Sequence, residues 1–272
     1  MTHIALGYDG SPGARTALDW VAVRAARENA RVDLITVTNM VTSNYENTER
    51  ELARAERLLL DLAPGVHVES HRIDGTMPNA LLKDARTSDL LVIGLHQQRP
   101  LRNALKGWMP QRLSARAHGP VALIPEGWSL VDGPVVVGVD DDPSSDEALM
   151  FAAAEAQSTH TTLRMVHAWS MPVPRLEGSS ALLASPLQVK ENHRRILREA
   201  MHRVQEAYPT VTIEEALVND NPPAALLHRS TDASIAVIGT HRRGVMAGGF
   251  FGSVAQDILG QIGCPVAIVP ND

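Results

Sequence analysis

Hydrophobic residues occur in short runs that alternate with longer amphipathic stretches. Residues 4–6 and 135–139 are short apolar runs, each followed by a turn of Gly, Asp or Pro, and this pattern predicts two strands. The stretch after the first run predicts a helix, because apolar residues recur on one face about every 3.6 positions (Ala14, Leu18, Val21 and Ala25). The same patterns predict strands at 32–37, 66–73, 90–94, 120–125, 163–166, 211–218, 235–239 and 265–270, and helices at 46–62, 79–85, 187–207 and 224–228.

These elements belong to two copies of one unit. The segment HIALGYDGSPGARTAL at 3–18 matches PVVVGVDDDPSSDEAL at 134–149, at an offset of 131 residues. Three later segments match at an offset of 145: GTMPNALL with DNPPAALL, LLVIG with IAVIG, and PVALIP with PVAIVP. The offset therefore grows by 14 residues, and the Pro- and Ser-rich stretch at 170–186 is the predicted insertion, a loop. Four matches in one order indicate a duplication.

The order of elements defines the fold class. Strands that alternate with helices predict an α/β protein whose parallel sheets carry helices on both faces. We expect five strands in each repeat and place the domains at residues 1–126 and 132–272, joined by a short linker with a glycine near each end. Ligands of such sheets bind beyond the carboxyl ends of the strands.

The composition narrows the classes of function. The 272 residues are 44% hydrophobic and carry a formal net charge of -6, which argues against a broad nucleic-acid surface because phosphate binding needs a basic patch. Cys264 is the only cysteine, so no intrachain disulfide can form. The first residues lack the pattern of a signal peptide, and no apolar run is long enough to span a membrane. We therefore expect a cytoplasmic protein without nucleic-acid or membrane partners.

Two loops of the second repeat have the chemistry of a nucleotide site. Asp140 follows the first strand, where its carboxylate can accept hydrogen bonds from ribose hydroxyls or, alternatively, cap the next helix. A glycine-rich loop follows the fourth strand, beginning at Gly239 and ending at Gly252 and Ser253 before a helical pattern. Glycines let backbone N–H groups approach phosphate oxygens, and a helix N-terminus adds further donors. The alternative is a flexible connection to a Ser-capped helix.

The spacing in that loop resembles the universal stress protein family. Its nucleotide-binding members carry Gly, two residues, Gly, nine residues, and then Gly-Ser or Gly-Thr. Gly239, Arg242, Gly252 and Ser253 stand at those four positions, with Arg in place of the second Gly. The resemblance covers the whole chain twice, through the Asp after the first strand, the VIG strand, the loop spacing and the terminal PVAxxP.

The resemblance implies two Rossmann-like five-stranded domains, often in dimers, with an ATP site in many members. Asp140 matches the residue that holds the adenosine part, and Ala168 matches the small residue against the adenine. Gly239, Gly252 and Ser253 match the phosphate loop. A non-glycine residue in a left-handed conformation costs about 1–2 kcal/mol. A charge-assisted bond from Arg242 to a phosphate can offset that cost.

The first repeat departs further from the pattern. Gly94 and Gly107 keep the spacing, but Gln97 replaces the second Gly and Trp108 replaces the hydroxyl residue. Loss of that hydroxyl removes a hydrogen bond to a charged group, worth about 1.5–3 kcal/mol. We expect this domain to be structural, with a degenerate nucleotide loop.

Catalytic motifs are absent from the sequence. It contains no Walker loop, nucleophile elbow or HExxH motif, and His67 and His71 share one face of a strand without a third metal ligand in view. We predict a stress-associated regulatory protein that binds ATP or another adenine nucleotide in its second domain without substantial turnover. The alternatives are an interaction module that binds no nucleotide, and a slow ATPase or self-phosphorylating protein that uses Ser253.

The terminal strands of the two repeats predict how the domains assemble. PVALIP and PVAIVP are apolar, and an unpaired strand edge of this kind must be covered. The linker at 126–133 reaches less than roughly 30 Å, so the domains stay close. We expect the two fifth strands to pair within one chain, with a homodimer through other faces as an additional assembly.

Overall fold

The computed structural model describes residues 1–39, 45–95, 109–141, 144–171, 185–241 and 253–271. The strands of the first repeat are β1 (Thr2–Gly7), β2 (Ala30–Thr38), β3 (His67–Asp74), β4 (Leu90–Leu95) and β5 (Val121–Pro125). Those of the second are β6 (Val135–Gly138), β7 (Leu163–Trp169), β8 (Ile213–Asn219), β9 (Ile235–His241) and β10 (Val266–Asn271). The helices are α1 (Pro12–Arg27), α2 (Tyr45–Leu62), α3 (Asn79–Asp84), η1 (Ala85–Thr87), α4 (Met109–Ser114), α5 (Ser144–Thr159), α6 (Pro186–Ala207), α7 (Pro222–Arg229) and α8 (Ser253–Leu259).

The ten strands form one sheet in the order β3-β2-β1-β4-β5-β10-β9-β6-β7-β8. Strands within each repeat pair in parallel, so each half is the expected five-stranded parallel sheet with a Rossmann-like order. The two halves join where β5 and β10 pair antiparallel, with Ala122 opposite Ala267. This pairing of the fifth strands confirms the expectation from their apolar sequences.

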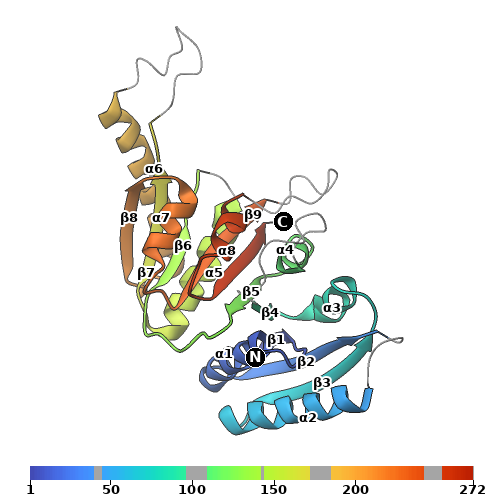
Figure 1. Cartoon of the computed structure of the whole chain (residues 1–272). Helices are drawn as coiled ribbons and strands as arrows, with labels where there is room; N and C mark the ends of the chain where they lie inside the picture. Colours follow the sequence, from blue (N-terminus) through green and yellow to red (C-terminus); the bar gives the residue numbers. More distant parts are fainter. Residues whose placement is uncertain (40–44, 96–108, 142–143, 172–184, 242–252, 272) are drawn as a thin grey trace.

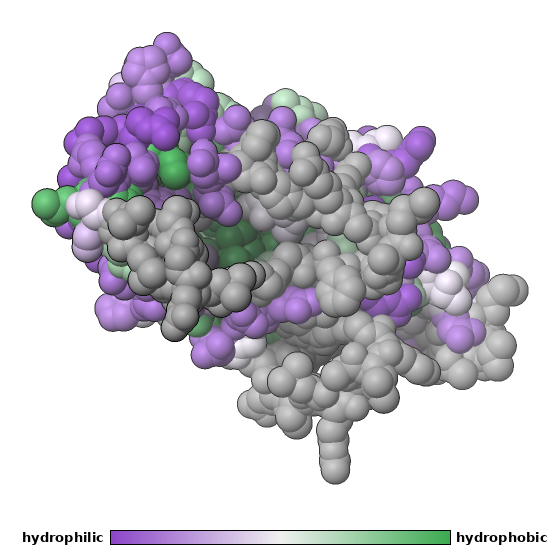
Figure 2. Space-filling view, turned by 90° about the horizontal axis from the view of Figure 1, so that it is seen from above, coloured by the Kyte–Doolittle hydropathy of each residue, from purple (hydrophilic) through white to green (hydrophobic). Residues whose placement is uncertain are grey.

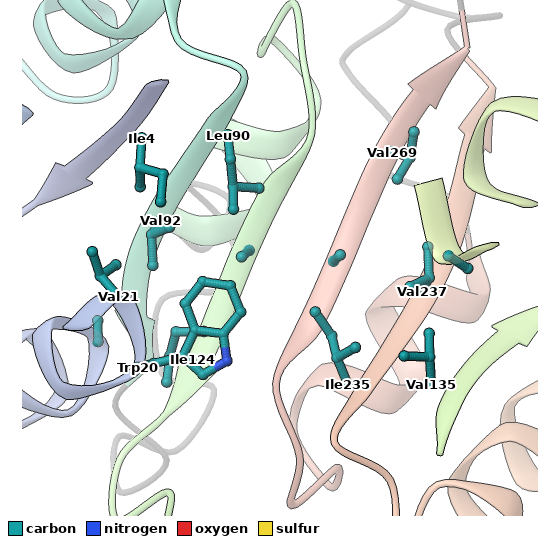
Figure 3. Close-up of a cluster of buried hydrophobic side chains, with 14 of the residues drawn as sticks. Ile4, Trp20, Val21, Leu90, Val92, Ile124, Val135, Ile235, Val237 and Val269 are labelled. Atoms are coloured by element: carbon teal, nitrogen blue, oxygen red, sulfur yellow. The ribbon is translucent and has the colours of Figure 1, made fainter. Parts of the chain in front are cut away.

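Helices cover both faces of the sheet (Figure 1). Apolar residues of α1, α2, α5 and α6 pack on one face, and those of α3, α4, α7 and α8 pack on the other. Each core layer continues from one repeat into the other. Figure 3 shows Trp20 and Ile124 on one side of the seam between β5 and β10, with Val237 and Val269 on the other.

A buried ion pair also bridges the repeats. Arg24 of α1 donates two hydrogen bonds to the carboxylate of Glu155 on α5, both at 2.5 Å. The side chains are 14% and 7% exposed, so solvent screens the pair weakly. The contact holds the first helices of the two repeats together beside the linker.

Local sequence sets where the helices begin, and several boundaries of helices and strands differ from the expected ones by one to three residues. The Ser11 hydroxyl accepts a hydrogen bond from the Ala14 N–H, so it caps α1, and Pro12 follows at the first turn. Helix α7 begins at Pro222 instead of residue 224, because Asn221 caps it by the same kind of bond. Strand β8 begins at Ile213, two residues later than expected.

The insertion predicted at 170–186 lies mostly outside the described residues. Pro186 already belongs to α6, which it opens as the first helical residue. Within the described part of the chain, no helix combines the length and the low polarity needed to cross a membrane.

Candidate functional site

The carboxyl edge of the second half-sheet is a topological switch point. Strand β6 lies between β7 and β9, and the chain proceeds from β6 toward one side of the sheet and from β9 toward the other. Crevices at such points are where open α/β sheets bind ligands. This edge faces the top of Figure 1, and the view from above shows a hollow with hydrophobic residues inside it (Figure 2).

Asp140 follows β6 at this edge and is exposed. One oxygen of its carboxylate accepts a hydrogen bond from the N–H of Asp141 at 2.8 Å. The equivalent residue of the first repeat, Asp9, accepts instead from the N–H of Ser11 at 3.0 Å, and Ser11 caps α1. In the first repeat, therefore, the side chains of this loop stabilise the N-terminus of α1.

Ala168 lies near the end of β7 and is half-buried. The register of β6 with β7 ends at the pair of Gly138 with Val166, so Asp140 lies two residues beyond the end of β6 and Ala168 lies two residues further along β7. The preceding residue, His167, is 2% exposed. The distance from its Nδ1 to the carbonyl oxygen of Val139 is 2.8 Å, so the ring ties the end of β6 to β7.

A second imidazole completes this contact. The Nε2 atom of His167 lies 2.9 Å from Nδ1 of His193 on α6. In a neutral His167, Nδ1 carries the proton because it faces a carbonyl, and Nε2 then accepts the hydrogen from Nδ1 of His193. Burial lowers the pKa of His193, and the neighbouring His167 lowers it further, against the opposing effect of nearby Asp141 and Asp140. No pattern in the sequence indicates this pair, since 26 residues separate His167 from His193.

Gly239 lies in β9 and is half-buried. Its counterpart in the first repeat, Gly94, has a structural explanation: a Cβ atom there would lie 2.2 Å from the backbone of Gly13 in α1. Close packing of the first helix therefore demands glycine at the end of the fourth strand in that repeat. A glycine at this position alone does not distinguish a nucleotide site.

The rest of the predicted phosphate loop cannot be placed. Arg242 and Gly252 lie outside the described residues, as do Gln97, Trp108 and Gly107 of the first repeat. Ser253 begins α8, but the position of its side chain is not described. The structure brings together Asp140, Ala168 and Gly239 at one edge and leaves the contribution of the loop a prediction.

The first repeat holds a group that the sequence analysis missed. The sequence shows no third metal ligand beside His67 and His71, whereas the structure places two carboxylates beside His71. Ligand atoms of Asp33, Glu69 and His71 all lie within 4.8 Å of one another. Glu69 precedes His71 by two positions on the same face of β3, a spacing visible in the sequence. Asp33 reaches them because β2 pairs with β3 in the register Asp33 to Glu69.

Comparison with known proteins gives one family. The sequence profile of the Universal stress protein family matches residues 1–125 and again 133–270. A universal stress protein of Mycobacterium tuberculosis is 28% identical over 309 residues, which cover 99% of this chain and 96% of that protein. A universal stress protein of Mycolicibacterium smegmatis is 24% identical, over 98% of this chain and 96% of its own length.

Solved structures agree on the fold. The crystal structure of a universal stress protein from Archaeoglobus fulgidus superposes with a TM-score of 0.74, covering 99% of this chain and 96% of that one at 16% identity. The crystal structure of a putative universal stress protein from Pseudomonas aeruginosa superposes with a TM-score of 0.66 at 17% identity, over 99% of this chain and 93% of that one. At these identities the likeness concerns the fold alone.

Proposed function

The chain belongs to the universal stress protein family, and on that premise we propose that it is a stress-associated regulatory protein whose second domain binds an adenine nucleotide. The nucleotide is ATP or a related adenine nucleotide, bound without substantial catalytic turnover. The second domain comprises residues 132–272, and the first, residues 1–126, lacks the site.

The observation that carries the proposal is the placement of Asp140 and Ala168. Both lie at the carboxyl edge beside the switch point, Asp140 in the loop that follows β6 and Ala168 near the end of the neighbouring strand β7. In the proposed complex the carboxylate of Asp140 accepts hydrogen bonds from the ribose hydroxyls, and the small Ala168 leaves room for the adenine ring. His167 supports this arrangement by fixing the end of β6 directly before Asp140.

The loop between β9 and α8 supplies the proposed phosphate contacts. Gly239 and Gly252 let backbone N–H groups approach the phosphate oxygens, and Ser253 adds a hydroxyl donor. Arg242 contributes a charge-assisted hydrogen bond in the position where relatives of the family carry glycine. These roles rest on the sequence spacing.

Calorimetric titration of the full chain with ATP tests the proposal. We expect one site per chain and a loss of affinity of roughly tenfold or more in Asp140→Ala, since a hydrogen bond to a charged group is worth about 1.5–3 kcal/mol. Asp9→Ala, the same change at the equivalent position of the first repeat, is the matched control and should leave ATP affinity unchanged. No binding of ATP, or equal effects of the two changes, would reject the assignment and leave an interaction module.

The slow-ATPase alternative has its own readout. Transfer of radiolabel from γ-labelled ATP to the protein, abolished in Ser253→Ala, would show self-phosphorylation. We expect no label above that of a heat-denatured sample.

A further inference from the structure

A polar cluster lies on the edge of the sheet in the first repeat, far along the sheet from the proposed nucleotide site. It occupies one face of β1, β2 and β3 near their amino ends, beside α3 (Figure 1). We call it the histidine–carboxylate cluster, formed by His3, Arg31, Asp33, Glu69, His71 and Asp84.

Asp33 is the buried centre of the cluster, with 5% of its surface exposed. One carboxylate oxygen lies 2.7 Å from Nε2 of His3, and the other accepts a hydrogen bond from Nε of Arg31 at 3.1 Å. The guanidinium of Arg31 also donates to Glu69 at 2.9 Å. An oxygen of Glu69 lies 3.6 Å from Nε2 of His71.

The two imidazoles face acceptors on both sides. Nδ1 of His3 lies 3.2 Å from the carbonyl oxygen of Thr87, and Nδ1 of His71 lies 3.2 Å from a carboxylate oxygen of Asp84. A neutral ring that donates through Nδ1 has a lone pair on Nε2. That nitrogen lies 2.7 Å from a carboxylate oxygen of Asp33 in His3, and 3.6 Å from one of Glu69 in His71. A cation between the two groups, either a proton on the ring or a metal ion, relieves the repulsion.

In the second repeat, the position equivalent to Asp33 has its charges balanced by an arginine. Arg164 occupies the place of Asp33 at the repeat offset of 131, and it pairs in register with Glu214. Its guanidinium donates to Glu214 at 2.9 Å and to Asp232 at 2.7 Å. One cation lies between two carboxylates there. In the first repeat Arg31 contacts two of the three carboxylates, Asp33 and Glu69. With neutral imidazoles the cluster, which has three carboxylates and one arginine, carries a net charge of about -2.

We propose that Asp33, Glu69 and His71 bind one divalent transition-metal ion, of the zinc type. Imidazole nitrogen and carboxylate oxygen are ligands that Zn²⁺ accepts, and a fourth position is left for water or for His3. A dication also balances the charge of the cluster. Asp84, behind His71, plays the part of the carboxylate that orients a ligating imidazole.

The geometry needs only a small contraction. The three ligand atoms lie within 4.8 Å of one another, whereas tetrahedral ligands with bonds of about 2.0–2.2 Å lie roughly 3.3–3.6 Å apart. Glu69 and His71 are 43% and 30% exposed at the side chain, so they can rotate toward Asp33. Arg31 is 38% exposed and can move its guanidinium into solvent when the ion enters. Arg31 is therefore a competitor of the metal.

Calorimetric titration of the tag-free full chain with Zn²⁺, supported by the visible absorption spectrum with Co²⁺, tests this site. We expect one ion per chain and a Co²⁺ spectrum of four-coordinate type. His71→Gln should weaken Zn²⁺ binding by roughly tenfold or more, and Asp84→Asn by about tenfold. The matched control is His202→Gln on α6, a histidine that is 72% exposed at the side chain and should leave binding unchanged.

Arg31→Gln separates the metal site from a network of salt bridges. Removal of the competing guanidinium should strengthen Zn²⁺ binding by at least severalfold, with the circular dichroism spectrum unchanged. Two results would overturn the proposal: no Zn²⁺ or Co²⁺ binding by the wild-type chain, or equal binding by His71→Gln and His202→Gln. Absence of metal binding would identify the cluster as a network of ion pairs and hydrogen bonds alone.

Discussion

The two halves of the sheet place opposite charges at the same position. On β2 of the first repeat stands Asp33, and on β7 of the second stands Arg164, each opposite a glutamate on the neighbouring strand. The arginine satisfies its carboxylate neighbours directly, whereas the aspartate gathers histidines and a second carboxylate around itself. The residue at this one strand position therefore distinguishes the two repeats. Arg164 forms an ion-pair network, whereas Asp33 belongs to a candidate metal site in an equivalent fold.

At the carboxyl edges of the two half-sheets it is the second repeat, and not the first, that keeps the candidate site. In the first repeat Asp9 and Ser11 are committed to the turn and to the cap of α1. In the second, Asp140 makes a local bond to Asp141, and the His167–His193 pair holds the strands behind it. The duplicated fold therefore separates its candidate chemistry, with the nucleotide site proposed for one repeat and the metal site for the other.

The largest effect is expected from breaking the seam that joins the two repeats. Ala267 is fully buried opposite Ala122, so Ala267→Asp places an unpaired charge between the halves. We expect a loss of about 4 kcal/mol or more in the free energy of unfolding. Ala53→Asp, on the exposed side of α2, is the control and should change it by about 0.5 kcal/mol or less. Urea unfolding measures the free energy of unfolding of both variants. Similar losses in Ala267→Asp and Ala53→Asp would contradict the buried pairing of β5 with β10.

The next effect compares the two arginines. Arg164 is 15% exposed at the side chain and Arg31 is 38% exposed. Arg164→Gln should therefore destabilise the metal-free chain by about 1–2 kcal/mol, because Glu214 and Asp232 lose the cation that they share. Arg31→Gln should cost less, about 0–1 kcal/mol, as in exposed ion pairs. A larger loss in Arg31→Gln would mean that Arg31 is the structural centre of its cluster and not a replaceable competitor.

The smallest effect is a pH dependence specific to the second repeat. The pKa of His193 is lowered from 6.5 by burial and by His167. The unfolded chain, with the ordinary value, binds more protons, so stability that is present above about pH 6.5 is lost as the pH falls below it. In His193→Gln the decline in stability between pH 7 and pH 5 should be shallower than in the wild type. The same decline in His193→Gln and in the exposed-site variant His202→Gln would refute this origin.

The fold could be predicted from the sequence because the same pattern of strands and helices occurs twice along the chain. Segments such as PVALIP and PVAIVP identified the fifth strands, and the apolar seam they form followed from the need to cover an edge. The ends of the elements were harder to predict, because they depend on local hydrogen bonds. The cap at Asn221, for example, moves the start of α7 to Pro222.

The sites were harder to predict because they depend on register and on distant packing. The sequence places His67 and His71 on one strand face but shows no third ligand, because Asp33 lies 38 residues before His71 and reaches it only through the pairing of β2 with β3. His193 reaches His167 from a helix that follows the insertion. Gly94, which spacing assigned to a degenerate nucleotide loop, is also required by its contact with Gly13.

Separate titrations of two variants with two ligands test the division of chemistry between the repeats most directly. Asp140→Ala and His71→Gln are each titrated with ATP and, in a separate experiment, with Zn²⁺, because ATP itself chelates the metal. We predict that Asp140→Ala loses affinity for ATP alone and that His71→Gln loses affinity for Zn²⁺ alone. Two results would contradict the assignment of one site to each repeat. In the first, either variant loses affinity for both ATP and Zn²⁺; in the second, neither variant loses affinity for either ligand.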